Sequence, residues 1–164
     1  MLALQQLEEV FDSQKIIEEV SSYHFRKDNI WFISSEDGKT YSPLGHDHVR
    51  ADRNLNQEKH DKLNKIFKGT YIGEIYNKLN DKYDICLGRY MKLYPKKCYT
   101  YHRDLTMRIH IPVVTNENCG FIVNDNFYRM PISGQTYLLD TTQKHSALNM
   151  SKEDRIHLVF CLKK

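Results

Sequence analysis

Two stretches of the chain determine the fold that we predict. Residues 99–114 read YTYHRDLTMRIHIPVV, and residues 145–160 read HSALNMSKEDRIHLVF. Because successive side chains of a β-strand point to opposite faces, both stretches predict strands with one polar row and one apolar row. The polar rows contain His102, Asp104, Thr106, Arg108, His110, Arg155 and His157, and the apolar rows contain Leu105, Met107, Ile109, Ile111, Val113, Ile156, Leu158 and Phe160. Since unpaired buried charges are costly, the polar rows predict a cavity that holds a charged group, and the apolar rows predict a hydrophobic core.

Length and composition indicate one soluble domain. With 164 residues, we expect a single domain, with a helical and loop half over residues 1–84 and a β core over residues 85–164. The net charge of +3, from 24 basic and 21 acidic residues, shows no concentrated basic excess, so no nucleic-acid partner is expected. Neither a signal peptide nor an apolar run of about 20 residues is visible, and the four cysteines form no CxxC pair. We therefore expect a cytoplasmic protein with reduced thiols and no membrane contact, and the oligomeric state stays open.

The periodicity of the chain predicts a mainly β protein with helices in its first half. Apolar residues three and four apart predict a helix over Leu4–Tyr23, and a second helix from Gln57 to Leu79 that is interrupted near Gly69 or Gly73. A short strand is expected over Ile30–Ile33. Eight further strands, separated by turn residues, are expected over residues 85–95, 98–104, 107–114, 119–124, 126–130, 135–140, 145–149 and 155–162. This order predicts an α+β fold in which a two-sheet jelly roll is braced by helices on one face.

Two residues of the first polar row and a distant histidine form a candidate metal site. His102 and Asp104 are two residues apart, so one strand can direct both toward one ion, and His145 would come from another strand. Two imidazoles and one carboxylate form the facial triad of non-haem Fe(II) oxygenases, which leaves positions for a co-substrate and dioxygen. The alternative is an ordinary HxD motif at the surface together with a core histidine.

Arginines near this triad predict a carboxylate ligand. Arg155 follows His145 by ten residues across the turn-like segment NMSKED, and a hairpin there would bring the two side chains together. A guanidinium pairs with a carboxylate through two parallel hydrogen bonds and so suits a dicarboxylate. A straight strand would place Arg108 about 20 Å from His102, so we expect the chain to bend at Leu105–Thr106.

The motifs RYMKLYP, YHRD, RIHIPVVTN, HSALN and DRIHLVF together resemble the aspartyl/asparaginyl β-hydroxylase-like family of Fe(II)- and 2-oxoglutarate-dependent dioxygenases, over roughly Gly88 to Leu162. The resemblance implies a double-stranded β-helix, which is a cupin-like jelly roll. It implies that Fe(II) is held by His102, Asp104 and His145. By the same resemblance, Arg155 binds the distal carboxylate of the co-substrate 2-oxoglutarate, and Arg108 and His110 lie near its other end, where they contact either co-substrate or substrate.

The activity that the resemblance implies is hydroxylation of an amino-acid side chain with O2, releasing succinate and CO2. The substrate is either a protein residue of the Asp or Asn type, in a peptide or protein, or a free amino acid such as proline. The chain departs from the animal protein hydroxylases at Met91, where those enzymes have a serine that contacts 2-oxoglutarate. Asp104 is retained, although some family members have glycine there.

Two other functions are compatible with the residues. One is a non-catalytic cupin-like module that binds a metal or a small carboxylate, and the other is a jelly-roll enzyme, such as an isomerase, that uses another metal. The segment with His46, His48 and Arg50 is either a solvated loop or a lid over the site. We also expect an apolar shell that includes Trp31 and some tyrosines to exclude water from the cavity.

Overall fold

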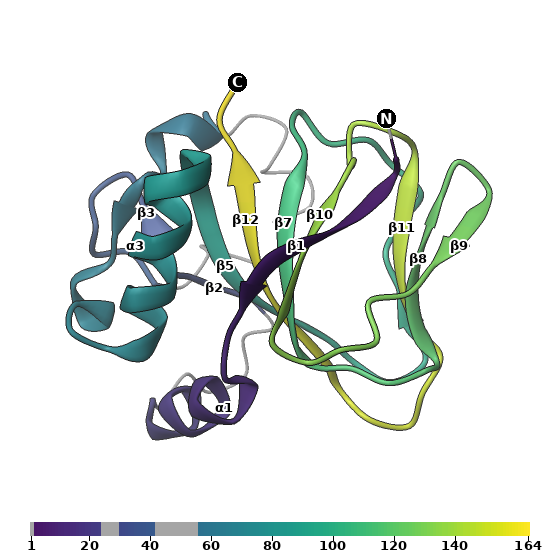
Figure 1. Cartoon of the computed structure of the whole chain (residues 1–164), viewed down its shortest axis with the longest axis horizontal. Coiled ribbons are helices and arrows are strands. Elements are labelled where there is room, and N and C mark those ends of the chain that lie inside the picture. The colour runs from purple at the N-terminus through teal and green to yellow at the C-terminus, as the bar shows by residue number, and fades with distance from the viewer. Residues whose placement is uncertain (1, 24–29, 42–55) are drawn as a thin grey trace.

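Two antiparallel sheets face each other in the computed structural model, which describes residues 2–23, 30–41 and 56–164 (Figure 1). The larger sheet has the order β1 (Leu4–Val10), β10 (Gln135–Leu139), β7 (Arg108–Val114), β12 (Arg155–Leu162), β5 (Ile85–Leu93) and β2 (Ile30–Phe32). The smaller sheet has the order β6 (Lys97–Cys98), β11 (His145–Asn149), β8 (Cys119–Val123) and β9 (Asn126–Tyr128). The predicted mainly β jelly roll with bracing helices is confirmed.

The helices α1 (Ser13–Ser22) and α3 (Tyr71–Tyr83) lie on the side of the larger sheet that faces away from the smaller one (Figure 1). The main hydrophobic core lies between these helices and the sheet. The apolar rows of β7 and β12 point into it, so their polar rows point toward the smaller sheet, as the alternation predicts. Core residues from these elements are Ile16, Val20, Ile72, Ile75, Leu79, Ile109, Ile111, Val113, Leu158 and Phe160.

The helix that we predicted over Leu4–Tyr23 is wrong in its first half. Leu4–Val10 forms β1, which pairs antiparallel with β10. The side-chain amide of Gln135 on β10 donates to the backbone carbonyl of Leu7, so the neighbouring strand satisfies groups that a helix would satisfy internally. The helix begins only at Ser13, where the carboxylate of Asp12 accepts hydrogen bonds from two backbone N–H groups of the first turn.

The second predicted helix is interrupted at Gly69, as expected, but only its last part is α-helical. Residues before Gly69 form two short 3₁₀ helices, η1 (Gln57–Lys59) and η2 (Lys65–Phe67), and the strand β4 (Lys62–Leu63), which pairs with β3 (Ser34–Ser35). The buried amide of Asn64 donates to the carbonyl oxygens of Phe32 and Thr40, which ties this segment to the first half of the chain. Gly69 has φ of 76°, which a helix does not tolerate.

The strands predicted after Ile85 are confirmed with one exception. The segment 98–104 is not a strand beyond Cys98, and it continues as a loop that makes one isolated bridge at His102. The loop connects β6 of the smaller sheet to β7 of the larger one, so the chain crosses here from one sheet to the other.

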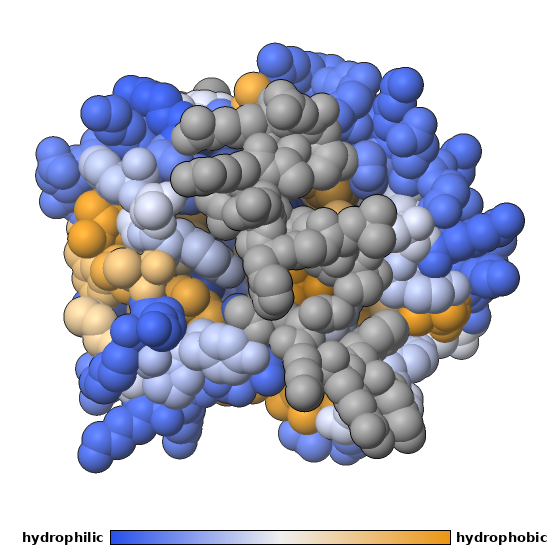
Figure 2. All heavy atoms as spheres, turned by 180° about the vertical axis from the view of Figure 1, so that it is seen from behind, coloured by the Kyte–Doolittle hydropathy of each residue, from blue (hydrophilic) through white to orange (hydrophobic). Residues whose placement is uncertain are grey.

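The surface of the described residues is mostly hydrophilic on the face opposite to that of Figure 1, with apolar patches between hydrophilic side chains (Figure 2). Exposed large apolar side chains belong to separate elements, among them Val10 on β1 and Phe127 on β9. No helix in the described part of the chain combines the length and the apolarity that a membrane crossing requires.

Phe160 provides a test of this core. Its ring is fully buried between the larger sheet and Tyr76 of α3, so Phe160→Ala should lower the free energy of unfolding by about 3–5 kcal/mol. Phe127→Ala removes the same atoms from a ring that is 40% exposed and should cost much less. Urea denaturation measures both values, and similar losses in the two variants would contradict this placement of the core.

Candidate functional site

Two backbone hydrogen bonds bring His102 and His145 together. The N–H of His102 donates to the carbonyl of His145 at 3.0 Å, and the N–H of His145 donates back at 2.8 Å. The N–H of Asp104 donates to the carbonyl of Thr141 at 2.9 Å, which ties the same loop to the segment that precedes β11. The backbone therefore holds these three side chains at the start of β11.

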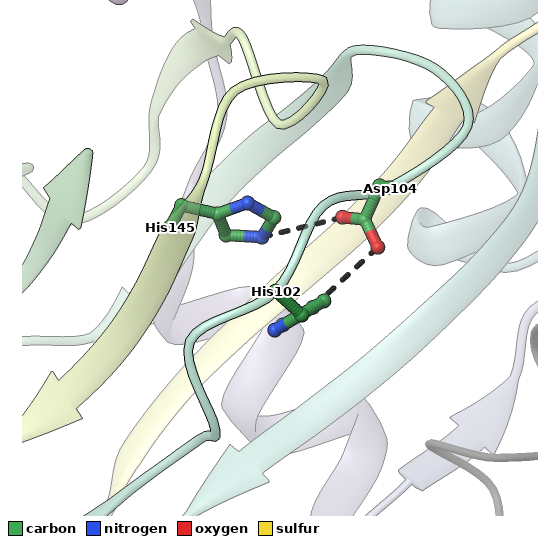
Figure 3. A group of neighbouring side chains, drawn as sticks. All are labelled: His102, Asp104 and His145. Carbon is green, nitrogen blue, oxygen red and sulfur yellow. Dashed lines mark ion pairs between the residues drawn. The ribbon is translucent and has the colours of Figure 1, made fainter. Parts of the chain in front are cut away.

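The three side chains point toward one another (Figure 3). Nε2 of His102 lies 3.5 Å from Oδ1 of Asp104, and Nε2 of His145 lies 3.3 Å from Oδ2. One potential ligand atom from each residue lies within 4.8 Å of the others. The carboxylate stands between two imidazoles, which is the arrangement that a shared cation would need.

Hydrogen bonds of the second ring nitrogens orient both imidazoles. Nδ1 of His102 lies 2.6 Å from the carbonyl oxygen of Thr100, and Nδ1 of His145 lies 3.0 Å from that of Gln143. A carbonyl can only accept, so Nδ1 donates in each ring, and only an Nε2 without a proton offers a lone pair to a cation. Backbone carbonyls commonly fix metal-binding histidines in this tautomer.

The charges around Asp104 favour its ionised form. Burial raises the pKa of its carboxyl, but hydrogen bonds from His102 and His145 and the charge of Arg108 outweigh it and hold the pKa well below the usual range. The hydrogen bond with Asp104 in turn raises the pKa of His102, against the effect of burial. Once a cation has displaced any proton from the two Nε2 atoms, these atoms and the ionised carboxylate form a donor set that suits Fe(II), and the residues therefore fit such an ion.

The chain bends at Leu105 and Thr106, as predicted. The bend is held by Gln57, whose amide donates to the hydroxyl of Thr106 at 3.0 Å, and by Thr141, whose hydroxyl donates to the carbonyl of Thr106 at 2.6 Å. It returns Arg108 to the site, where Nη2 lies 2.8 Å from Oδ1 of Asp104.

A cavity of about 200 Å³ begins at this cluster and extends between the two sheets. Its wall includes all six residues that the sequence singled out. They are His102, Asp104, Arg108, His110, His145 and Arg155.

Arg155 lies in this cavity with its charge unbalanced. The side chain is 4% exposed, and its guanidinium carbon lies 4.6 Å from the centre of the Phe121 ring. Among residues 2–23, 30–41 and 56–164, no carboxylate forms an ion pair with it, and burial lowers its pKa to about 10. A buried cation without a counter-charge is costly, so this part of the cavity favours an anionic ligand.

The hairpin that we predicted between His145 and Arg155 is wrong. β11 belongs to the smaller sheet and β12 to the larger one, and the turn between them crosses from one sheet to the other. The amide of Asn149 holds this crossing by donating to the carbonyl oxygens of Leu93 and Glu153. Arg155 consequently approaches the cavity from the sheet opposite His145 rather than alongside it.

His110 lies on β7 and is 5% exposed, with its ring 5.0 Å from that of Phe121. Neither ring nitrogen has a hydrogen-bond partner in the described part of the protein. Burial, with the charges of Arg155 and Arg108, holds the pKa of His110 well below its usual value, so the ring is neutral. An unpartnered neutral imidazole at the cavity wall can donate to, or accept from, a ligand.

Some wall residues were missed or misassigned. Trp31, which we expected in the apolar shell, stacks on Tyr90 in the helix-side core, and its neighbours Ile30 and Phe32 line the cavity instead. The alternation of β2 could have shown this reversal. Phe121 and Gln57 carried no signal, because their roles depend on contacts between distant segments. His46, His48 and Arg50 lie outside the described residues.

The match to a family model agrees with this site. Residues 57–164, more than half of the chain, match the model of aspartyl/asparaginyl β-hydroxylase. This chain belongs to the aspartyl/asparaginyl β-hydroxylase family. The predicted resemblance is confirmed, and the match includes all six site residues that the sequence predicted. Met91, at the position where the animal protein hydroxylases have a serine, also lies at the cavity wall of this aspartyl/asparaginyl β-hydroxylase family member.

Solved structures share the fold of this family member. An oxidoreductase of the 2OG-Fe(II) oxygenase family from Burkholderia pseudomallei is 11% identical, with 97% of this chain and 83% of that protein covered at a TM-score of 0.56. The viral collagen prolyl hydroxylase of Paramecium bursaria Chlorella virus 1 is 10% identical, with 99% and 97% covered at a TM-score of 0.51. A likeness to the plu4264 protein of Photorhabdus luminescens is partial: it covers 47% of this chain and 62% of that protein, at 17% identity and a TM-score of 0.39. The first two establish a fold of the 2OG-Fe(II) oxygenase type.

The cluster should bind a divalent metal. We expect Mn(II), an air-stable substitute for Fe(II), to raise the melting temperature, and His145→Ala to weaken binding more than about 100-fold because it removes a ligand. His60→Ala, which changes a histidine outside the cavity wall, is the control. Calorimetric titration measures the affinities, and equal affinity in the His145 variant and the control would exclude this metal site.

Proposed function

We propose that this chain is an Fe(II)- and 2-oxoglutarate-dependent dioxygenase that hydroxylates an amino-acid side chain. In the balanced reaction, 2-oxoglutarate, O2 and a C–H bond give succinate, CO2 and a C–OH group. His102, Asp104 and His145 would hold Fe(II), and Arg155 would bind the distal carboxylate of 2-oxoglutarate.

One observation supports this proposal above all others. A single cavity has the two-histidine, one-carboxylate cluster at its wall and, on the opposite sheet, a buried arginine with no acidic partner in the described part of the chain. A ligand that chelates the ion through one end and carries a second carboxylate at the other end would satisfy both features. 2-Oxoglutarate is such a ligand.

The residues of the chain would bind, orient and exclude water. Arg155 would pair with a carboxylate through the edge of its planar guanidinium, while the Phe121 ring lies against one face of that group. A cation bound at Asp104 would compete with Arg108 for the carboxylate, and Arg108 lies where an anionic group of the co-substrate or substrate would approach the same ion. His110 would offer a ring nitrogen to the same ligands.

Bound Fe(II), with 2-oxoglutarate and O2, supplies the oxidising power that replaces an aliphatic hydrogen by hydroxyl. The apolar side chains on the cavity wall, which include Phe32, Leu93 and Ala147, would keep water away from the reacting groups. The proposed substrate is a side chain of the Asp or Asn type in a protein or peptide, or a free amino acid such as proline. Met91, in place of the serine of the animal enzymes, argues for a different arrangement around the co-substrate.

Succinate formation tests the proposed reaction. Aerobic protein with Fe(II), 2-oxoglutarate and ascorbate should release succinate slowly even without the substrate, and His102→Ala and His145→Ala should abolish this release because each removes a ligand. Enzymatic or NMR detection of succinate provides the measurement, with His60→Ala as the control. If the wild type produces no more succinate than the two site variants, the chain is a binding module rather than a dioxygenase.

The role of Arg155 predicts opposite effects on binding and stability. Arg155→Met should weaken 2-oxoglutarate binding more than about tenfold, because it removes a charged hydrogen-bond donor. The same change removes an unbalanced buried charge. The free energy of unfolding of the unliganded variant should therefore be no lower than that of the wild type. Arg155→Lys keeps the charge without the planar fork and should bind with intermediate affinity.

Calorimetry on the Mn(II)-loaded protein and urea denaturation measure the two quantities. An unchanged 2-oxoglutarate affinity in Arg155→Met would remove this arginine from the co-substrate site. A large loss of stability with no loss of affinity would make it a structural residue.

A further inference from the structure

Arg155 has a neutral neighbour at the position where a buried arginine usually has a carboxylate. His157 lies two residues further along β12, on the same face, and is 1% exposed. Its Nδ1 lies 3.4 Å from Nη2 of Arg155. The other ring nitrogen, Nε2, has no hydrogen-bond partner in the described part of the chain. The polar contact of this ring is therefore with Arg155.

The chemistry of the pair determines which atom donates. A guanidinium carries only donors, so Nδ1 of His157 must accept and the proton of the neutral ring must sit on Nε2. Burial and the charge of Arg155 both hold the pKa of His157 well below its usual value, which agrees with a neutral ring. The rings of His110, at 5.6 Å, and Phe121, at 6.2 Å, also lie beside His157, and neither adds a negative charge.

A neutral acceptor orients an arginine without cancelling its charge. A carboxylate at this place would pair with Arg155 and compete with any anionic ligand, whereas an imidazole leaves the positive charge available. The guanidinium is then held by two contacts, with Phe121 against its face and His157 at Nη2. Side chains of Arg carry much rotamer freedom, and fixing it before the ligand arrives lowers the entropy lost on binding.

We propose that His157 is a positioning residue for Arg155: as a neutral hydrogen-bond acceptor it holds the guanidinium in the orientation that binds the distal carboxylate of a dicarboxylate co-substrate. This inference rests on the function proposed above. His157 is absent from the cavity wall, so it acts through Arg155 rather than by touching the ligand.

Two substitutions at this position separate orientation from packing. His157→Asn places an amide oxygen near the position of Nδ1 and preserves the acceptor, whereas His157→Leu fills similar space without one. We expect His157→Leu to raise the dissociation constant for 2-oxoglutarate about tenfold, because a hydrogen bond to a charged group is lost, and His157→Asn to stay within about threefold of the wild type. Leu158→Ala, on the opposite face of β12, is the control that should lose stability while keeping its affinity.

Calorimetric titration of the Mn(II)-loaded proteins with 2-oxoglutarate measures the affinities, and urea denaturation measures stability. Wild-type affinity in His157→Leu overturns the positioning role, and so does a His157→Asn variant that binds as weakly as His157→Leu. A wild-type protein that binds no 2-oxoglutarate overturns the proposed function, and the positioning role with it. The two failures are distinguished by the wild-type titration alone.

Histidine ¹⁵N NMR tests the contact without any ligand or any buried substitution at His157 itself. The wild-type spectrum should show His157 as the neutral tautomer with an unprotonated Nδ1, and Arg155→Met should shift that Nδ1 signal because its donor is removed. A protonated Nδ1 in the wild type contradicts the proposed hydrogen bond, and so does an Nδ1 chemical shift that is unchanged in Arg155→Met.

Discussion

The pair of backbone hydrogen bonds between His102 and His145 is the interaction on which the site depends. It joins a loop that leaves the smaller sheet to the first residue of β11, and it therefore sets the separation of the two imidazoles before any ligand binds. The backbone N–H of Asp104 donates to the carbonyl of Thr141, and this hydrogen bond positions Asp104 beside the two histidines. The backbone therefore holds the candidate metal ligands in place, and the carbonyl groups of Thr100 and Gln143 orient the two imidazoles.

The cavity is asymmetric in charge, and this asymmetry indicates what it binds. Near the histidines, Asp104 and Arg108 balance each other. Across the cavity, Arg155 is supported by an aromatic face and a neutral imidazole, which orient it without neutralising it. An anion beside Arg155 would relieve an electrostatic cost of the unliganded protein, whereas a cation at the cluster would compete with Arg108 for Asp104. The proposed iron and 2-oxoglutarate fit that division.

Strands β7 and β12 explain how a small protein combines this polar cavity with a stable core. Ile109 and Ile111 of β7 face the helices. Arg108 and His110, which alternate with them along the strand, face the smaller sheet. The core residues hold the strands in register, and this register sets where the polar residues on the other face lie. The same alternation was visible in the sequence, whereas the strand Leu4–Val10 was not, because its pairing with β10 overrides a helical pattern.

The sequence by itself determined the mainly β fold and the two faces of β7 and β12, because alternation is a local property, and it supplied the six residues that meet at the cavity through their types and the family resemblance. Only the tertiary structure decided that β11 and β12 lie in opposite sheets, that Phe121 supports Arg155, and that Gln57 holds the bend before Arg108. Those arrangements depend on backbone pairings and packing between segments far apart in the chain. No local pattern encodes them, since a strand's own residues do not specify which sheet it joins.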